Sequence, residues 1–359
     1  MPKIALIGDS LSGGGAEKVH AHLSIYFQRN GMEVHNCIFS DRISYQFEGS
    51  VLNLGKIDAD GSSISRKWNR FQSLRTFILE NKFDHVIDFR MRTNPLQELM
   101  ISMLYPKNSI YTVHSSILEY YFPKPFIFAK RIFSKHRIVT VSEAIKQIIT
   151  SEKIAHDVTC IYNPINFESI LNQKEQFKVG GSYIIAVGRM NDEVKQFDKL
   201  IEAYSQTELP DRKIKLLFLG EGKNEKQLKA IAQNKGLYHL IEFHGFAANP
   251  FPYYKNALFL VLPSKKEGFP MVIAEALASE TPVVAFDCVS GPNEIIAHRE
   301  NGFLVENQNF PALVSAINLM VKDERLYLHC KQNASSSVQR FSLDIVGSQW
   351  LQYLKSNVS

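Results

Sequence analysis

Residues 257–278 read ALFLVLPSKKEGFPMVIAEALA. The apolar run at the start is typical of a strand that is buried on both faces of a parallel sheet. Pro270 suits the first turn of a helix, where its missing N–H costs no hydrogen bond, and the apolar sequence after it predicts that helix. The stretch therefore predicts a strand, a turn and a helix, with Glu267 in the turn and Glu275 inside the helix.

The two carboxylates suit a ligand that carries both hydroxyl and phosphate groups. Glu267 stands just before the predicted helix, and Glu275 lies one to two turns inside it, on roughly the same side. Carboxylates accept hydrogen bonds from vicinal sugar hydroxyls. The free amides of a helix N-terminus attract phosphate. The combination favours a nucleotide-sugar, in which phosphates join two sugars.

Short apolar runs alternate with amphipathic segments along the whole chain, which predicts βα units and parallel sheets. We expect strands at Lys3–Gly8, Glu33–Phe39, His85–Phe89, Ser109–His114, Arg137–Val141, Val158–Tyr162, Tyr183–Val187, Ile214–Leu219, Ile241–His244, Ala257–Leu262 and Pro282–Phe286. The pattern lapses around residues 163–165 and 173–181, which predicts a linker. Because 359 residues are many for one hydrophobic core, we expect two doubly wound α/β domains, at residues 1–165 and 166–341.

Composition excludes several classes of protein. Apolar residues make up 45% and charged residues 21% of the chain, as in ordinary globular proteins. The four cysteines are scattered without metal-ligand spacing, which argues against a zinc site and a disulfide framework. No apolar run approaches the ~18–20 residues of a membrane span, and residues 3–8 are too few for a signal peptide. We therefore expect a cytoplasmic protein.

Positive charge is concentrated in the first half of the chain. Residues 1–165 hold 20 Lys and Arg against 15 Asp and Glu, and so carry the whole net charge of +5. Basic and aromatic residues mix in residues 66–75 and 120–137, as at the surface of an anionic membrane. No nucleic-acid motif accompanies them, so no nucleic-acid partner is expected. The alternative, in which the aromatics form core and the cations are solvated, stays open.

Glycine-rich and cationic turns follow other predicted strands. Gly13, Gly14 and Gly15 stand between a strand and a helix, where backbone can approach a ligand closely. Arg189 and Lys195 follow the strand at residues 183–187, where two cations could hold a diphosphate. A flexible turn and solvated surface charges are the alternatives.

Further candidates have weaker signals. His114 ends a predicted strand, and Gly222 and Phe246 lie in the turns after two others. Arg90 and Arg92 follow a strand as well, and fit either an anionic acceptor or a structural ion pair. Asp58 and Asp60 spell a D-x-D metal motif, but they sit in a polar loop away from the other motifs, so no metal site is expected.

The region from Leu262 onward resembles the Glu-x7-Glu region of the family 4 retaining glycosyltransferases, of the type that builds bacterial cell-surface glycans. The matching segments, in family order, are Leu262-Pro-Ser, Glu267-Gly-Phe-Pro, Glu275-Ala, Thr281-Pro-Val-Val and Ser290-Gly-Pro-Asn-Glu-Ile-Ile. The resemblance covers nearly the whole chain and is strongest over residues 183–305. Glu280 departs from the pattern, because glycine is usual before the Pro-Val-Val strand. The resemblance implies a GT-B fold, in which two Rossmann-like domains face each other across a cleft and a final helix, residues 342–359, completes the first domain.

The resemblance also implies roles for the candidate residues. The catalytic residues would be Glu267, His114, Arg189 and Lys195. The donor-binding residues would be Gly13, Gly14, Gly15, Arg189, Lys195, Gly222, Phe246, Glu267, Gly268, Phe269 and Glu275. Arg90 and Arg92 are the acceptor candidates. The second domain would bind the donor, with Glu267 on the sugar and Glu275 on the ribose.

The function implied is transfer of a sugar, with retained configuration, from a nucleotide-sugar, UDP-linked in our interpretation, to a glycan or lipid-linked acceptor. Neither a metal nor a cofactor is expected, and the protein would work in the cytoplasm at the inner face of the cell membrane. Two alternatives remain. One is a nucleotide-sugar epimerase on the same fold, and the other is a catalytically silent nucleotide-sugar binding module.

Overall fold

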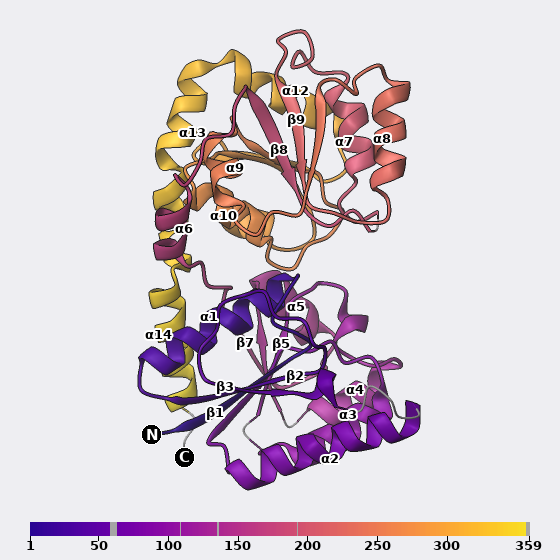
Figure 1. The fold of residues 1–359 in the computed structure, drawn as a ribbon, viewed down its shortest axis with the longest axis vertical. Coiled ribbons are helices and arrows are strands. Elements are labelled where there is room, and N and C mark those ends of the chain that lie inside the picture. Colours follow the sequence, from indigo (N-terminus) through magenta and orange to yellow (C-terminus); the bar gives the residue numbers. More distant parts are fainter. Residues whose placement is uncertain (58–62, 108, 135, 192, 357–359) are drawn as a thin grey trace. The chain divides into compact units, whose positions relative to one another are not determined.

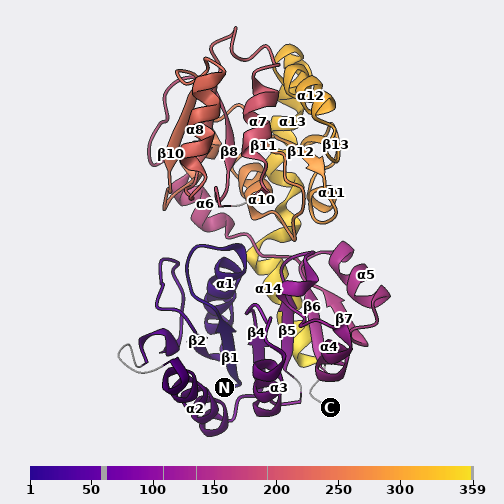
Figure 2. The same cartoon turned by 90° about the vertical axis from the view of Figure 1, so that its right-hand side faces the viewer.

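The computed structural model describes residues 1–57, 63–107, 109–134, 136–191 and 193–356. They divide into two compact units (Figures 1 and 2). Unit 1 is Met1–Pro164 with Leu343–Ser359, and unit 2 is Ile165–Ser342. Each unit is an α/β domain built on one parallel sheet, as the alternating pattern predicts.

Unit 1 contains a seven-stranded parallel sheet in the order β3-β2-β1-β4-β5-β6-β7. Its strands are β1 (Lys3–Gly8), β2 (Glu33–Ile38), β3 (Ser50–Asn53), β4 (His85–Asp88), β5 (Ile110–Val113), β6 (Arg137–Thr140) and β7 (Asp157–Cys160). Its helices are α1 (Gly15–Arg29), α2 (Ser63–Asn81), α3 (Pro95–Leu104), α4 (Phe126–Phe133), α5 (Glu143–Ser151) and α14 (Leu343–Lys355). The strand order reverses between β1 and β4, so the crevice for a ligand is expected there.

The last helix, α14, belongs to unit 1 although the whole of unit 2 precedes it. Its buried residues Val346 and Trp350 share a core with Tyr26 of α1. A Cβ on Gly347 would lie 2.5 Å from the Tyr26 ring, so this glycine allows the two helices to approach closely. Arg137 of β6 donates to the backbone oxygen of Tyr353 at 3.0 Å. The apolar stripe of α14 is therefore buried against unit 1.

Unit 2 contains a six-stranded parallel sheet in the order β10-β9-β8-β11-β12-β13. Its strands are β8 (Tyr183–Val187), β9 (Lys215–Leu219), β10 (Ile241–Gly245), β11 (Leu260–Leu262), β12 (Val283–Asp287) and β13 (Gly302–Glu306). Its helices are α6 (Phe167–Gln173), α7 (Phe197–Tyr204), α8 (Glu225–Asn234), α9 (Phe251–Asn256), α10 (Met271–Ala278), α11 (Pro292–Ile295), α12 (Phe310–Lys322) and α13 (Glu324–Ser337). Here the strand order reverses between β8 and β11.

Two strands were absent from the sequence prediction, β3 and β13, and both lie at the edge of a sheet. An edge strand pairs on one side only, so its sequence need not carry the continuous apolar run of a central strand. In β3 the residues are exposed or half-buried. In β13 the apolar run is short and follows a glycine, Gly302.

Side-chain caps start several helices where the sequence offers Asn, Ser or Asp. Asn94 accepts from two amides at the start of α3, and Ser142 accepts from the Ile145 amide in α5. Within the described residues, no helix is both long enough and apolar enough to span a bilayer.

Candidate functional site

The strongest candidate site in unit 2 lies where the strand order reverses. β8 and β11 are neighbours, and the loops after them carry Lys195 and Glu267. Lys195 Nζ donates to Glu267 Oε1 at 2.6 Å. The two side chains are 21% and 12% exposed, so the ion pair is shielded but within reach of a ligand. In open α/β sheets ligands bind at this point, outside the carboxyl ends of the strands.

Backbone hydrogen bonds hold the loops that carry this ion pair. The Lys265 amide donates to the Val194 oxygen at 2.8 Å, which ties the loop after β11 to the loop after β8. The Met190 amide donates to the Glu221 oxygen at 3.0 Å, which ties the loop after β8 to the loop after β9. A Cβ on Gly220 would collide with the Gly188 oxygen, so the two loops meet only because that residue is glycine. Lys195 and Glu267 are therefore on fixed loops.

The loop after β12 supports the Glu267 turn from another side. Ser290 Oγ donates to the Gly268 oxygen at 2.7 Å. Gly291 has a φ of 94°, and a Cβ there would lie 2.5 Å from Pro270 Cδ. Both the left-handed backbone and the close approach require glycine. In the sequence this Ser-Gly-Pro segment contributes only to the resemblance, and its supporting role is seen in the tertiary structure.

Glu275 lies in the second turn of α10 and is almost wholly buried. Its Oε2 is 3.5 Å from the hydroxyl of Tyr254, which donates to it. Burial, together with this carboxylate, raises the pKa of Tyr254, so the phenol keeps its proton. The structure thus places Glu275 beside a neutral donor, and its role toward a ribose stays a prediction.

The other predicted donor-binding residues of unit 2 divide into two groups. Arg189 is exposed, and Phe246 is 59% exposed, so both side chains are accessible. Phe269 is buried and packs edge-on against Phe341 with the ring centroids 5.1 Å apart. The side chain of Phe269 therefore serves packing, and only its backbone could serve a ligand. A Cβ on Gly222 would lie 2.6 Å from the Met190 oxygen, so this glycine also serves loop packing.

Unit 1 places its glycine loop at its own switch point, after β1. Gly13 is exposed with a φ of 83°, Gly14 is the N-cap of α1, and Gly15 begins the helix. A Cβ on Gly14 would collide with the carboxylate of Glu17, which therefore lies over the first turn. The loop offers helix amides as predicted, next to one negative side chain.

His114 follows β5 and is held in one orientation. Thr112 Oγ1 donates its proton to the Asp88 oxygen at 3.1 Å. His114 Nε2 lies 3.0 Å from the same hydroxyl oxygen, so Nε2 carries the proton and donates to it. Burial and the nearby Arg92 lower the pKa of His114 to about 3, which keeps the ring neutral. Nδ1 then has a lone pair, and within the described part of the chain no group donates to it.

Arg90 and Arg92 correct the prediction of an acceptor site. Arg90 is 2% exposed and donates to Asp88 Oδ2 at 2.6 Å and to Glu98 Oε2 at 3.2 Å. Arg92 is fully buried and donates to four backbone oxygens, including that of Thr112 at 2.8 Å. Neither guanidinium faces solvent, because Arg90 neutralises buried carboxylates and Arg92 binds backbone oxygens in the core behind β4. The structural interpretation that the sequence left open is the one the structure favours.

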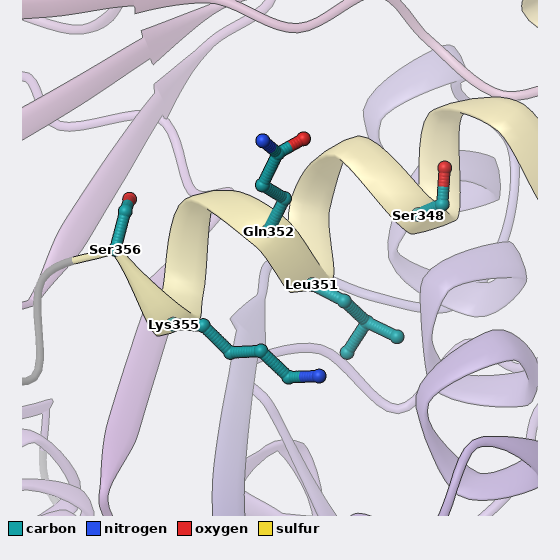
Figure 3. A pocket seen from close by; sticks show the side chains of 5 residues that line it. All are labelled: Ser348, Leu351, Gln352, Lys355 and Ser356. Atoms are coloured by element: carbon teal, nitrogen blue, oxygen red, sulfur yellow. The ribbon is translucent and has the colours of Figure 1, made fainter.

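Among the described residues, neither a cluster of metal ligands nor the hollow along α14 gives a competing site. Asp58 and Asp60 lie outside the described residues. Within those that are described, no group of three or more His, Cys, Asp or Glu could hold a metal ion. A hollow along α14 is lined by Ser348, Leu351, Gln352, Lys355 and Ser356 (Figure 3). Its lining comes from one helix and the residue after it and includes neither a carboxylate nor a histidine, so it does not suit a nucleotide-sugar.

Comparison with known proteins agrees with this geometry. A family model described as glycosyl transferases group 1 matches residues 168–337, and one described as glycosyltransferase family 4 matches residues 13–169. The chain belongs to glycosyltransferase family 4. The resemblance seen in the sequence is thereby confirmed, and this glycosyltransferase is an enzyme that transfers sugars.

Relatives of this glycosyltransferase match it over different lengths. An uncharacterized glycosyltransferase of Haemophilus influenzae is 28% identical over 216 residues, which are 60% of this chain and 60% of that protein. The N-acetylgalactosamine-N,N'-diacetylbacillosaminyl-diphospho-undecaprenol 4-alpha-N-acetylgalactosaminyltransferase of Campylobacter jejuni is 26% identical, over 99% of this chain and 100% of that one. The crystal structure of Anabaena Alr3699/HepE in complex with UDP and glucose matches with a TM-score of 0.81 and 18% identity, over 99% and 100% of the two chains. This likeness shows the GT-B fold.

One carboxylate near the switch point of unit 1 is not among the site residues that the sequence predicts for this glycosyltransferase. Asp9 directly follows β1, and its Oδ2 accepts from the Met91 amide at 3.0 Å, so it joins the loops after β1 and β4. Burial raises the pKa of Asp9 above its ordinary value. Its position at the end of the first predicted strand was the signal that could have identified it.

Proposed function

We propose that this glycosyltransferase moves a sugar from a UDP-sugar to a glycan or lipid-linked acceptor in the synthesis of a cell-surface polysaccharide or lipopolysaccharide. The transfer retains the anomeric configuration and needs no metal. The observation that carries the proposal is the ion pair of Lys195 with Glu267 at the switch point of unit 2. It puts a cation for phosphate and a carboxylate for hydroxyls side by side.

The ion pair explains how a nucleotide-sugar would be held. A diphosphate competes with Glu267 for the Lys195 ammonium, and Arg189, which is exposed, adds a second cation. Once Lys195 turns to phosphate, the carboxylate of Glu267 is available to accept hydrogen bonds from sugar hydroxyls. A charge-assisted hydrogen bond contributes about 1.5–3 kcal/mol. Binding of the nucleotide-sugar would replace the single bond between Lys195 and Glu267 with several bonds of this kind.

The same cations would act in the chemical step. The bond from the anomeric carbon to the diphosphate breaks, and the acceptor oxygen bonds to that carbon on the same face. The leaving diphosphate helps to take the proton of the acceptor hydroxyl, and UDP is released. Lys195, Arg189 and helix amides stabilise the negative charge that grows on the diphosphate. Their positions on fixed loops support this role.

Unit 1 would supply hydrogen bonds rather than charge. The Nδ1 lone pair of His114 suits a hydroxyl that donates to it, because the ring stays neutral. The amides at the start of α1, after Gly13 and Gly14, suit an anion or a sugar oxygen. These two features support a role for unit 1 in positioning the transferred sugar.

The relatives support the donor and the acceptor class. The Anabaena protein was solved with UDP and glucose, and the Campylobacter enzyme is named for a lipid-linked diphospho-undecaprenol acceptor. A lipid-linked acceptor would bring this chain to the inner face of the cell membrane. Neither an epimerase nor a silent binding module is favoured, because the named relatives are transferases.

A donor screen tests the proposal. UDP-, GDP- and ADP-sugars are compared by thermal shift and by release of nucleotide, each with and without excess EDTA. We expect a UDP-sugar to raise the melting temperature and to be slowly hydrolysed, equally with and without EDTA. Turnover that needs added magnesium or manganese would contradict metal independence. Binding of a UDP-sugar without any transfer or hydrolysis would favour the silent module.

A further inference from the structure

The chain passes between the two units at two points, and the residues of unit 2 at these points are neighbours. Unit 2 begins at Ile165 and ends at Ser342. The Ile165 amide donates to the Phe341 oxygen at 2.7 Å, and Ile165 pairs with Ser342 in an isolated parallel bridge. The first and last residues of unit 2 therefore hold each other in place.

Phe341 links this pair of crossings to the turn that carries Glu267, which we call the donor turn (residues 267–270). Phe341 ends the short 3-10 helix η3 (Gln339–Phe341) and is fully buried. Its ring packs edge-on against Phe269, with the ring centroids 5.1 Å apart and the planes at 77°. Phe269 stands two residues after Glu267 in the sequence. A residue next to one crossing therefore packs directly against the donor turn.

Arg340 makes a second link, to the loop after β12. Its Nη2 donates to the Glu294 oxygen at 2.5 Å, and its guanidinium carbon lies 4.6 Å from the centroid of the Phe341 ring. Glu294 is in α11, which follows the Ser290 that donates to the Gly268 oxygen. Two adjacent residues near the end of unit 2 thus contact the donor turn and the segment that supports it.

The position of the donor turn matters because Glu267 has a directional task. A carboxylate accepts a hydrogen bond from a hydroxyl only over a narrow range of distance and angle. A displacement of about 1 Å can slow an enzyme about 100-fold, even when its cause is far from the reacting atoms. A hydrogen bond to Gly268 fixes the backbone of the turn, and the buried ring of Phe269 is an apolar anchor for it. Phe341, which packs on that ring, therefore affects the rate as well as the stability.

We propose that Phe341 is a positioning residue for the donor sugar, which acts through Phe269 on the carboxylate of Glu267. It also connects the donor turn to the two points where the chain passes between the units. The inference rests on the proposed function, because it takes Glu267 as the residue that holds the hydroxyls of the transferred sugar.

Hydrolysis and binding by the full chain test the proposal. The donors are UDP-glucose, UDP-galactose and their N-acetyl forms, and the one that the wild type hydrolyses fastest is used for the variants. We expect Phe341→Leu to slow hydrolysis per folded molecule about tenfold, because a displaced turn misplaces Glu267. Its affinity for UDP, measured by titration calorimetry, should stay within about twofold of the wild type, because Lys195 and Arg189 hold the diphosphate.

A double-mutant cycle separates positioning from general damage. If Phe341 acts through Glu267, its replacement has little left to disturb once the carboxylate is gone. Phe341→Leu should therefore slow the Glu267→Gln enzyme less than about twofold. A second loss of about tenfold in that background would show that the two residues act independently, and would overturn the proposal.

Two further variants keep the test specific. Phe303→Leu makes the same change at a phenylalanine that is 4% exposed in the core of unit 2. It should lower the melting temperature about as much as Phe341→Leu, while hydrolysis stays within about twofold of the wild type. Arg340→Gln changes an exposed side chain, so the protein should fold, and hydrolysis should slow about threefold with unchanged affinity for UDP. This variant decides the question if Phe341→Leu does not fold.

The outcomes for the positioning role and for the proposed function differ. A Phe341→Leu enzyme that hydrolyses no more slowly than Phe303→Leu would overturn the positioning role, while a slow Glu267→Gln enzyme would still support the proposed function. A wild type that hydrolyses none of the four donors would contradict the proposed function instead. The affinity for UDP-glucose relative to UDP then tests the positioning role, and should fall in Phe341→Leu as it does in Glu267→Gln. An unchanged ratio in Phe341→Leu would overturn it.

Discussion

The switch points of the two units carry similar residues in opposite states. In unit 2, between β8 and β11, Lys195 and Glu267 form an ion pair that is 21% and 12% exposed. In unit 1, beside β4, Arg90 and Asp88 form an ion pair that is 2% and 0% exposed. Both pairs stand where a doubly wound sheet binds ligands. The strand order therefore sets where a ligand can bind. The exposure of the charged side chains at that point decides whether they can bind the ligand or only stabilise the fold.

The partners of each ion pair explain the difference. Arg90 donates to Asp88 and Glu98, and the Tyr105 hydroxyl donates to the same Asp88 carboxylate at 3.0 Å. Because this ion pair is buried so completely, none of its charged groups is accessible to a ligand. Lys195 reaches Glu267 from a loop, and the hydrogen bonds that fix that loop are made by its backbone. A ligand can therefore take the charged groups without unfolding the loops.

The largest expected effect follows from breaking the buried ion pair. Arg90→Met leaves the buried Glu98 carboxylate without its cation, and leaves Asp88 with only the more distant Arg92, whose Nη1 lies 3.8 Å from Asp88 Oδ1. We expect the free energy of unfolding to fall by about 3–5 kcal/mol. Urea unfolding followed by circular dichroism measures this change.

The control for that variant is Arg189→Met, which removes an exposed arginine of unit 2. Its stability should stay within about 0.5 kcal/mol of the wild type, while transfer falls. The comparison between the units fails if Arg189→Met is the less stable variant, or if Arg90→Met unfolds like the wild type.

The next effect concerns catalysis. Glu267→Gln keeps the size of the side chain but removes the charge that pairs with Lys195 and would hold the sugar hydroxyls. We expect transfer to slow at least tenfold, which is about 1.4 kcal/mol of barrier, with an unchanged melting temperature. Initial rates with the preferred UDP-sugar measure it.

Glu193→Gln is the matched control, since Glu193 stands in the same loop as Lys195. Its carboxylate is 88% exposed and pairs with Lys265 at 3.3 Å. Exposed ion pairs of this kind contribute little, so the rate should stay within about twofold of the wild type. Equal losses in the two variants would remove Glu267 from the sugar site.

The smallest expected effect lies just beyond the end of α10. Glu280 stands where the family has glycine. Its φ is 65°, a backbone conformation that is strained for any residue other than glycine. Its carboxylate pairs with Lys174 at 2.6 Å and with Lys255, and these bonds lower the pKa of Glu280. We expect both Glu280→Gly and Glu280→Gln to lose the ion pairs, but only glycine relieves the strain.

The glycine variant should therefore be the more stable of the two by about 1 kcal/mol. Because the pKa of Glu280 is lowered on folding, its contribution is present at neutral pH and is lost as the pH falls through the lowered value. The gap between the wild type and Glu280→Gln should then narrow in acid. A gap that stays constant from neutral to acid pH would show that the ion pairs do not stabilise unit 2.

The sequence by itself determined the fold class and the central strands. Continuous apolar runs such as the one before Pro263 can only be buried on both faces, and their alternation with amphipathic segments requires parallel sheets. It also determined which loops hold Lys195, Glu267 and His114, because polar residues that directly follow such strands collect at one edge of a sheet. The strands β3 and β13 were not predicted, because the residues of β3 are exposed or half-buried and the apolar run of β13 is short. The other two edge strands, β7 and β10, carry enough of the apolar pattern to be predicted.

Only the tertiary structure decided how each polar residue is used. Arg90 and Arg189 both follow a strand with the same local signal, yet one is buried among carboxylates and the other is exposed. Phe269 is in the motif, but its ring packs on Phe341, 72 residues further along the chain. Burial, pairing and pKa depend on neighbours that are distant in sequence, and local spacing carries no record of them.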